Sequence, residues 1–234
     1  DGSEYPLKSD DVTLVHQDVL WLEKSVHEIV FKGISSAPRL SLNRGFSAPV
    51  IIECDELDYP FLMANDRDGF VRYEAAHQFG IETLEAMMNG SEVNERYIES
   101  YGAILCDGSI EAMFKSQILE LPTLTTLMQR QAVIEVDAIF KAHEKLKQVL
   151  ARRYFSEMLS MLEGLYNPSN AHIDGVSMGK RALKNRLLGL LMSAGDESVN
   201  ALCLSHYHES LSMSERLTAL DLLENYAPDL ASGA

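Results

Sequence analysis

The sequence predicts a mainly α-helical protein, in which a short β-sandwich remnant precedes an irregular, solenoid-like α-helical superhelix. Up to residue 55, apolar residues form short runs typical of strands, whereas from Leu57 onward they recur at the spacing of amphipathic helices. Between the two patterns, residues 41–50 contain a glycine, a proline, one arginine and one phenylalanine. We therefore expect residues 1–55 to be part of a β-sandwich domain and residues 56–234 to be a C-terminal α-helical domain.

The first unit carries three or four predicted strands. Residues 12–15, 19–22, 26–31 and 50–52 are short apolar or alternating runs rich in β-branched side chains. A free-standing sandwich needs about seven strands. We therefore expect residues 1–55 to be half of a domain whose other half lies upstream, with a hairpin packed directly on the helices as the alternative.

About eight helices are predicted in the second unit. Asp68 is expected to cap the first long helix, Asn89-Gly90 to end it, and Ser109 to cap a later one. Short breaks of Gly, Asn, Pro or Ser suggest antiparallel pairs stacked as a solenoid without a fixed repeat. The longest helix would be about 45 Å long if straight. The expected helices cover residues 70–88, 93–105, 110–118, 124–129, 136–165, 178–193, 198–208 and 214–226.

A structural joint is expected at Arg44, Gly45, Phe46 and Pro49. Gly45 can adopt a positive φ and Pro49 blocks helix, whereas a flexible linker would be small and polar. In a packed joint, Phe46 should be buried between the two units. Arg44 should then be held by acidic or carbonyl acceptors that offset its desolvation. The competing interpretation makes Arg44 a substrate contact.

Charge and composition exclude several classes of partner. A net charge of −15 would be repelled by nucleic acid and by anionic membranes. Three widely spaced cysteines indicate neither a disulfide framework nor a thiolate metal site, which fits a reducing compartment. We find no leader and no apolar run of about 18 residues, and therefore expect a cytoplasmic protein. A chain that begins without methionine suggests a piece of a longer protein.

The run Arg-Gly-Phe-Ser-Ala-Pro-Val at residues 44–50 resembles a junction in the bacterial aminopeptidase N (alanyl aminopeptidase) family of zinc metallopeptidases. In that family the junction joins a small β-sandwich domain to the C-terminal helical domain. Residues 61–76, 180–185 and 207–214 resemble the family in the same order, so the likeness spans about residues 10–227.

This resemblance implies a parent protein that uses zinc to remove N-terminal residues from peptides. The catalytic domain, and with it the zinc, would lie upstream in the same polypeptide. The chain itself would be a noncatalytic lid that limits access to the active site, with its helical domain incomplete. Its partners would be that catalytic domain and peptide substrates, without nucleic acid or membrane.

The zinc site of this family needs two histidines at i and i+4 on one helix face, with a glutamate general base between them. Three His-Glu pairs occur, and none has the second histidine, so we expect no catalytic residue and no metal ligand. His206 and His208 are expected to be exposed at a helix end. The pairs are His27-Glu28, His143-Glu144 and His208-Glu209, with Phe31, Lys147 and Ser212 at the i+4 positions.

Ser177 lies in a Gly-x-Ser-x-Gly match at residues 175–179. That motif acts as a nucleophile only on a sharp turn between a buried strand and a helix, and the preceding residues are polar. We therefore interpret Ser177 as a helix N-cap rather than the nucleophile of a hydrolase.

A stand-alone α-solenoid that binds a partner protein is the alternative function. Such a scaffold has no use for unpaired strand edges in residues 1–55, which favours the aminopeptidase interpretation.

Overall fold

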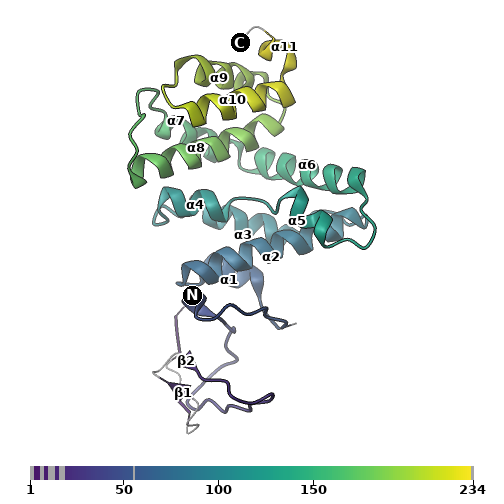
Figure 1. Ribbon diagram of the computed structural model, residues 1–234, viewed down its shortest axis with the longest axis vertical. Helices are drawn as coiled ribbons and strands as arrows, with labels where there is room; N and C mark the ends of the chain where they lie inside the picture. The colour runs from purple at the N-terminus through teal and green to yellow at the C-terminus, as the bar shows by residue number, and fades with distance from the viewer. Residues whose placement is uncertain (1–2, 6–7, 10–13, 16–18, 55, 233–234) are drawn as a thin grey trace.

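The computed structural model describes residues 3–5, 8–9, 14–15, 19–54 and 56–232, which form an elongated, mainly helical molecule (Figure 1). Two short strands lie at one end of its long axis. The helices follow one another along this axis, and the last of them lie at the opposite end.

The N-terminal unit contains much less regular structure than its sequence predicts. Strands β1 (Leu14–Val15) and β2 (Val19–Leu20) form an antiparallel pair in which Leu14 lies opposite Leu20. The prediction of strands at residues 26–31 and 50–52 is wrong, because both segments are irregular. A strand needs a neighbour to bond its backbone groups, and no such neighbour lies beside them in the part of the chain that is described. Residues 12 and 13 lie outside the described residues.

Eleven α-helices occur in the described residues, and Arg44–Phe46 forms one additional 3-10 turn, η1. Most predicted helices are present with shifts of a few residues. The helices are α1 Tyr59–Asn65, α2 Gly69–Met88, α3 Glu95–Cys106, α4 Ala112–Ile118, α5 Leu124–Gln129, α6 Val136–Arg153, α7 Phe155–Leu165, α8 Gly175–Ser193, α9 Glu197–Glu209, α10 Met213–Tyr226 and α11 Pro228–Ala231.

Local capping explains where several helices begin. The Asp68 side chain accepts a hydrogen bond from Val71 N (2.9 Å), which confirms it as the N-cap of α2. The predictions for two serines are wrong. Ser177 donates its amide to Asp174, the true N-cap of α8 (2.9 Å), and Ser109 hydrogen-bonds Asp107 instead of capping α4. Ser177 is thus in the first turn of a helix, which removes the nucleophile interpretation.

The long helix predicted over residues 136–165 is divided in two at Tyr154. This residue has φ −118° and ψ 29°, and its hydroxyl donates to the carbonyl oxygen of Ile98 in α3 (2.9 Å). α6 ends before it and α7 begins after it, so that both can pack on α8. A contact between residues far apart in the sequence therefore interrupts a continuous helical pattern.

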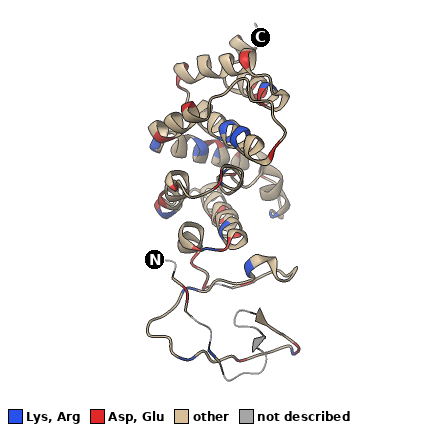
Figure 2. Ribbon diagram, turned by 90° about the vertical axis from the view of Figure 1, so that its left-hand side faces the viewer, with Lys and Arg blue, Asp and Glu red and all other residues tan. Residues whose placement is uncertain are grey.

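The helices enclose one continuous apolar core. α1 packs on α2, α4 on α8 and α9 on α10, while α6 connects the two ends by contacting α2 and α8. Leu84, Leu105 and Leu146 are fully buried in this core. Acidic and basic residues are interspersed along the helices (Figure 2). No helix within the described ranges combines the length and apolarity that a bilayer crossing requires.

Candidate functional site at the joint

The joint is a tight turn over residues 43–48. Asn43, Gly45 and Phe46 all have positive φ (54°, 63° and 52°), and Gly45 is the residue type that tolerates this best. The Asn43 side chain closes the turn, since Nδ2 donates to the carbonyl of Ala48 and Oδ1 accepts from its amide, both at 3.0 Å. Sequence reasoning missed Asn43, although asparagine tolerates a positive φ and its side chain often hydrogen-bonds the backbone of a turn.

Arg44 is held by carboxylates. Its Nη2 lies 2.7 Å from Glu4 Oε1 and 3.4 Å from Asp66 Oδ1. These are acidic acceptors of the kind expected for Arg44, and its hydrogen bond lowers the pKa of Glu4. The amide of Gly45 donates to Asp68 Oδ2 (2.9 Å), so one aspartate both caps α2 and anchors the joint to it.

The expectation that Phe46 is buried is wrong, because its side chain is 55% exposed. One face of the ring packs on Phe70 of α2, with ring centroids 5.0 Å apart. Residues 49–51 do not cover the other face, since Pro49 is exposed and Ile51 is 93% exposed. The polar anchors of Arg44 and Gly45, rather than a buried phenylalanine, attach the joint to the turn between α1 and α2.

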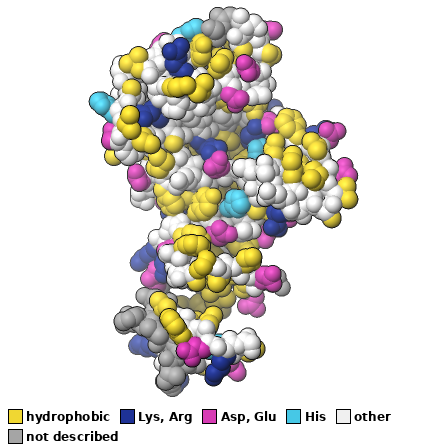
Figure 3. Space-filling model, viewed as in Figure 1, with side chains coloured by type: hydrophobic (Ala, Val, Ile, Leu, Met, Phe, Trp, Pro, Cys, Tyr) yellow, Lys and Arg dark blue, Asp and Glu magenta, His cyan; other side chains and the backbone are white. Residues whose placement is uncertain are grey.

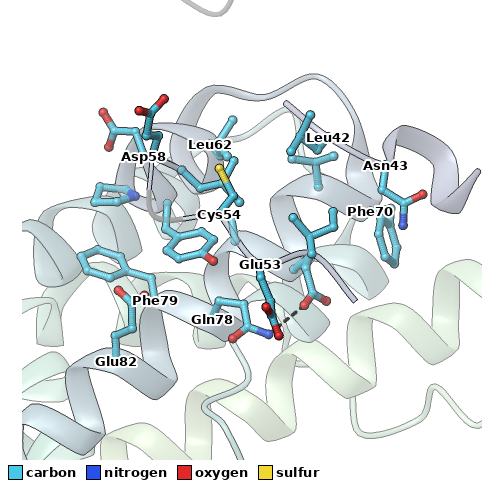
Figure 4. Close-up of a pocket in the computed structure, with 18 of the residues that line it drawn as sticks. Leu42, Asn43, Glu53, Cys54, Asp58, Leu62, Phe70, Gln78, Phe79 and Glu82 are labelled. Carbon is cyan, nitrogen blue, oxygen red and sulfur yellow. Dashed lines mark hydrogen bonds between the residues drawn. The ribbon is translucent and has the colours of Figure 1, made fainter. Parts of the chain in front are cut away.

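A groove with a volume of about 1300 Å³ lies beside the joint, between residues 50–54 and 56–58 on one side and helices α1 and α2 on the other. Glu74, Gln78 and Glu82 line it at successive turns of α2, and Gln78 Nε2 donates to Glu74 Oε1 (2.9 Å). Figure 4 shows Glu53, from the overlying segment, directed toward Gln78. The groove therefore carries carboxylates on both of its walls.

The groove is electronegative. Burial and the neighbouring Glu85 raise the pKa of Glu82, and burial together with Glu82 and Glu74 raises that of Tyr59. Its two arginines are already paired: Arg96 with Asp58 (3.0 Å) and Arg130 with Glu85 (2.8 Å). The groove has the charge to attract cations but holds no histidine, and nothing in its lining suggests catalysis.

Residues 56–233 match the family described as a domain of unknown function (DUF3458_C) with ARM repeats, and residues 3–55 match a domain of unknown function (DUF3458) with an Ig-like fold. The chain belongs to this ARM-repeat family. ARM repeats are stacked helix pairs, and an Ig-like fold is a β-sandwich. The predicted fold class, a β-sandwich remnant followed by a helical superhelix, is thus confirmed.

Two curated relatives of this chain are named aminopeptidase N. The protein from Escherichia coli (strain K12) is 25% identical over 210 residues, which are 86% of this chain and 24% of that protein. The protein from Caulobacter vibrioides is 27% identical over 220 residues, 92% of this chain and 25% of that protein. The resemblance to bacterial aminopeptidase N is confirmed, and the chain spans about a quarter of the length of these relatives.

A solved structure shares the fold. The crystal structure of Legionella pneumophila aminopeptidase A in complex with aspartic acid superimposes with a TM-score of 0.70 at 23% sequence identity. The match covers 82% of this chain and 24% of that one. The fold of most of this chain therefore occurs within a much longer chain.

The His-Glu pairs of this chain do not fit a zinc ion. His27 Nε2 accepts the amides of Glu23 and Lys24 (3.1 and 2.9 Å), and half-buried His143 faces Lys147, whose charge adds to burial in lowering the pKa of His143. His208 lies edge-on to Tyr207. No group of three or more metal-binding side chains occurs among the residues that the structure describes.

The expectation that both helix-end histidines are exposed is wrong for one of them. His208 is exposed, but His206 is only 2% exposed. It lies against Tyr166, which follows α7, while its own helix α9 packs on α10. Helix-end position alone could not reveal this burial.

Proposed function

We propose that the chain is a noncatalytic part of a zinc-dependent aminopeptidase that removes N-terminal residues from peptides. The observation that supports this most is the ARM-repeat match over residues 56–233, together with aminopeptidase N relatives that align over most of the chain. The zinc and the catalytic residues would belong to an upstream catalytic domain of the same polypeptide, since the His-Glu pairs here do not suit a metal.

The role of the chain in that enzyme would be to pack domains together and to form part of the chamber through which peptides reach the active site. Arg44, Gly45, Phe46 and Pro49 would serve as the structural joint. The exposed apolar residues beside it, including Ile51, offer a surface for the preceding part of the polypeptide. The electronegative groove would favour peptides with a positively charged amino terminus over anionic ligands.

The cytoplasm is the compartment we propose. The cysteines at 54, 106 and 203 are free thiols, as a reducing compartment would keep them. Because its net charge is −15, we expect the chain to bind neither nucleic acid nor membranes.

Zinc analysis and an activity assay test this function on the 234-residue chain. After dialysis, we expect less than stoichiometric zinc by plasma mass spectrometry and no hydrolysis of alanine p-nitroanilide. One tightly held zinc per chain together with hydrolysis would overturn the noncatalytic assignment.

The coding sequence upstream of Asp1 provides the second test. We expect it to encode His-Glu-x-x-His. If that motif is absent, the stand-alone α-solenoid that binds a partner protein becomes the better interpretation.

A further inference from the structure

A cluster of polar side chains is buried where α8, α9 and α10 meet. Lys184, His206, Ser210 and Glu215 are each 2–3% exposed. Burial of this many polar groups is unusual, because each loses its hydration. We call these four residues, together with Tyr166, the polar cluster.

Most members of the polar cluster are paired. Lys184 of α8 forms an ion pair with Glu215 of α10, and Ser210 Oγ donates to the other carboxylate oxygen of Glu215 (2.6 Å). The Lys184 ammonium also lies 5.6 Å from the centre of the Tyr166 ring, within the range of a cation–π contact. The Tyr166 hydroxyl donates to Glu209 of α9.

His206 is the exception, since neither of its ring nitrogens has a hydrogen-bond partner. Its ring stacks on the ring of Tyr166, which also lies near Lys184, with ring centroids 5.1 Å apart and ring planes 20° apart. The charged groups that act on it are Lys184 from α8, Glu215 from α10 and Glu209 from its own helix. Both carboxylates are already engaged, by Lys184 and by Tyr166.

Tyr166 begins the connection between α7 and α8, residues 166–174, which we call the strap. Two further hydrogen bonds hold the strap down. The amide of Leu211, between α9 and α10, donates to the carbonyl of Pro168 (3.0 Å), and Arg181 Nη1 donates to the carbonyl of Asn170 (3.0 Å). The strap is therefore attached to α8, to α9 and to the turn before α10.

We propose that His206 is a proton-sensitive latch, and that its protonation releases the strap from α9 and from the turn before α10. An imidazolium at this position would be a buried cation beside Lys184 without a free acceptor. The simplest relief is to move Tyr166 away so that water reaches the ring. Pro168 then separates from Leu211, because it lies two residues from Tyr166. This latch is independent of the function proposed above.

The direction of the pH effect follows from the neutral state of the buried ring. Burial, reinforced by Lys184, lowers the pKa of His206 from 6.5 to about 4. The closed strap is therefore favoured above pH 6.5 and loses that advantage as the pH falls toward 4. With a pKa of about 4 when the strap is closed and 6.5 when it is open, the equilibrium constant for strap opening should be about 20-fold larger at pH 5 than at pH 7.

Hydrogen exchange of the Leu211 amide measures this opening directly, after correction for the intrinsic exchange rate at each pH. In the native chain we expect the increase of about 20-fold between pH 7 and pH 5, whereas amides inside α8, such as Leu188, should change far less. His206→Phe keeps an aromatic ring against Tyr166 but cannot be protonated. It should reduce the increase to less than about twofold.

His208→Gln is the matched control, because it removes an exposed histidine two residues away and should leave the increase intact. An increase that persists in His206→Phe, or that is absent from the native chain, would overturn the latch. An equal increase at Leu188 would overturn it as well, since the whole helical unit would then be opening. Should His206→Phe fail to fold, His206→Gln is measured with the same criterion.

Discussion

Both units of this chain contain large apolar residues, but the N-terminal unit exposes them and the helical unit buries them. In the N-terminal unit Trp21, Val26 and Ile51 are 60%, 78% and 93% exposed, whereas Leu84 and Leu105 of the helical unit are fully buried. A helix bonds its own backbone and needs partners only for its apolar face, but a strand needs neighbours for both. Apolar side chains therefore form a core in the helical unit and remain at the surface of the N-terminal unit.

Exposed apolar residues in the helical unit gather at a few places. Val133, Ile134, Val136 and Phe140 are all more than half exposed around the start of α6. Hydrophobic side chains are visible together on the lobe formed by α5 and α6 (Figure 3). In the N-terminal unit, by contrast, such residues are spread over most of residues 19–51.

The largest expected difference between the two units is in how much their ion pairs contribute to the free energy of unfolding. Lys184 and Glu215 are paired inside the core, whereas the Arg44 side chain is 37% exposed where it meets Glu4 and Asp66. Removal of one partner from a buried pair leaves an unpaired charge, so Lys184→Met should reduce the free energy of unfolding by about 3–5 kcal/mol. Arg44→Met should reduce it by at most about 1 kcal/mol.

Urea unfolding followed by circular dichroism measures both variants. The double variant Lys184→Met/Glu215→Leu should recover most of the loss, because no unpaired charge remains. Equal losses for Lys184→Met and Arg44→Met would contradict the contrast between the two units.

Truncation of one leucine in each unit sharpens the comparison. Leu105→Ala removes a fully buried side chain and should reduce the free energy of unfolding by about 2–5 kcal/mol. Leu22→Ala is the same chemical change at a side chain that is 67% exposed, and should stay within about 0.5 kcal/mol of the native value. A loss of several kcal/mol for Leu22→Ala, in the same urea experiment, would mean that the N-terminal unit has a core in solution.

A small effect is also expected at the joint. Phe46→Ala should reduce the free energy of unfolding by less than about 1 kcal/mol, because only one face of the ring is covered. Phe79→Ala, at a side chain that is 4% exposed, should cost about 3–5 kcal/mol and serves as the control. If the two phenylalanines proved equally important, the joint would be a packed hinge after all.

Local signals in the sequence were sufficient for most of the helices. Helix α5 has the bounds that its pattern predicts, and α2 begins after Asp68 and ends before Asn89-Gly90 as expected. Caps and helical periodicity act over a few residues, so they can be read without a fold. The family resemblance at residues 44–50 was visible for the same reason, as a continuous run.

Only the tertiary structure decided the remaining features, because each depends on residues far apart in the sequence. Tyr154 divides a continuous helical pattern by bonding Ile98, and His206 is buried because α8 and the strap bring Lys184 and Tyr166 to it. The groove likewise exists only where the segment after the joint crosses α2. Composition and spacing determined that this chain would be a stack of helices, whereas they predicted more strands before it than the described residues contain. The packing of the helices on one another determined which polar groups lost contact with water, because burial depends on a residue's neighbours and not on its own type.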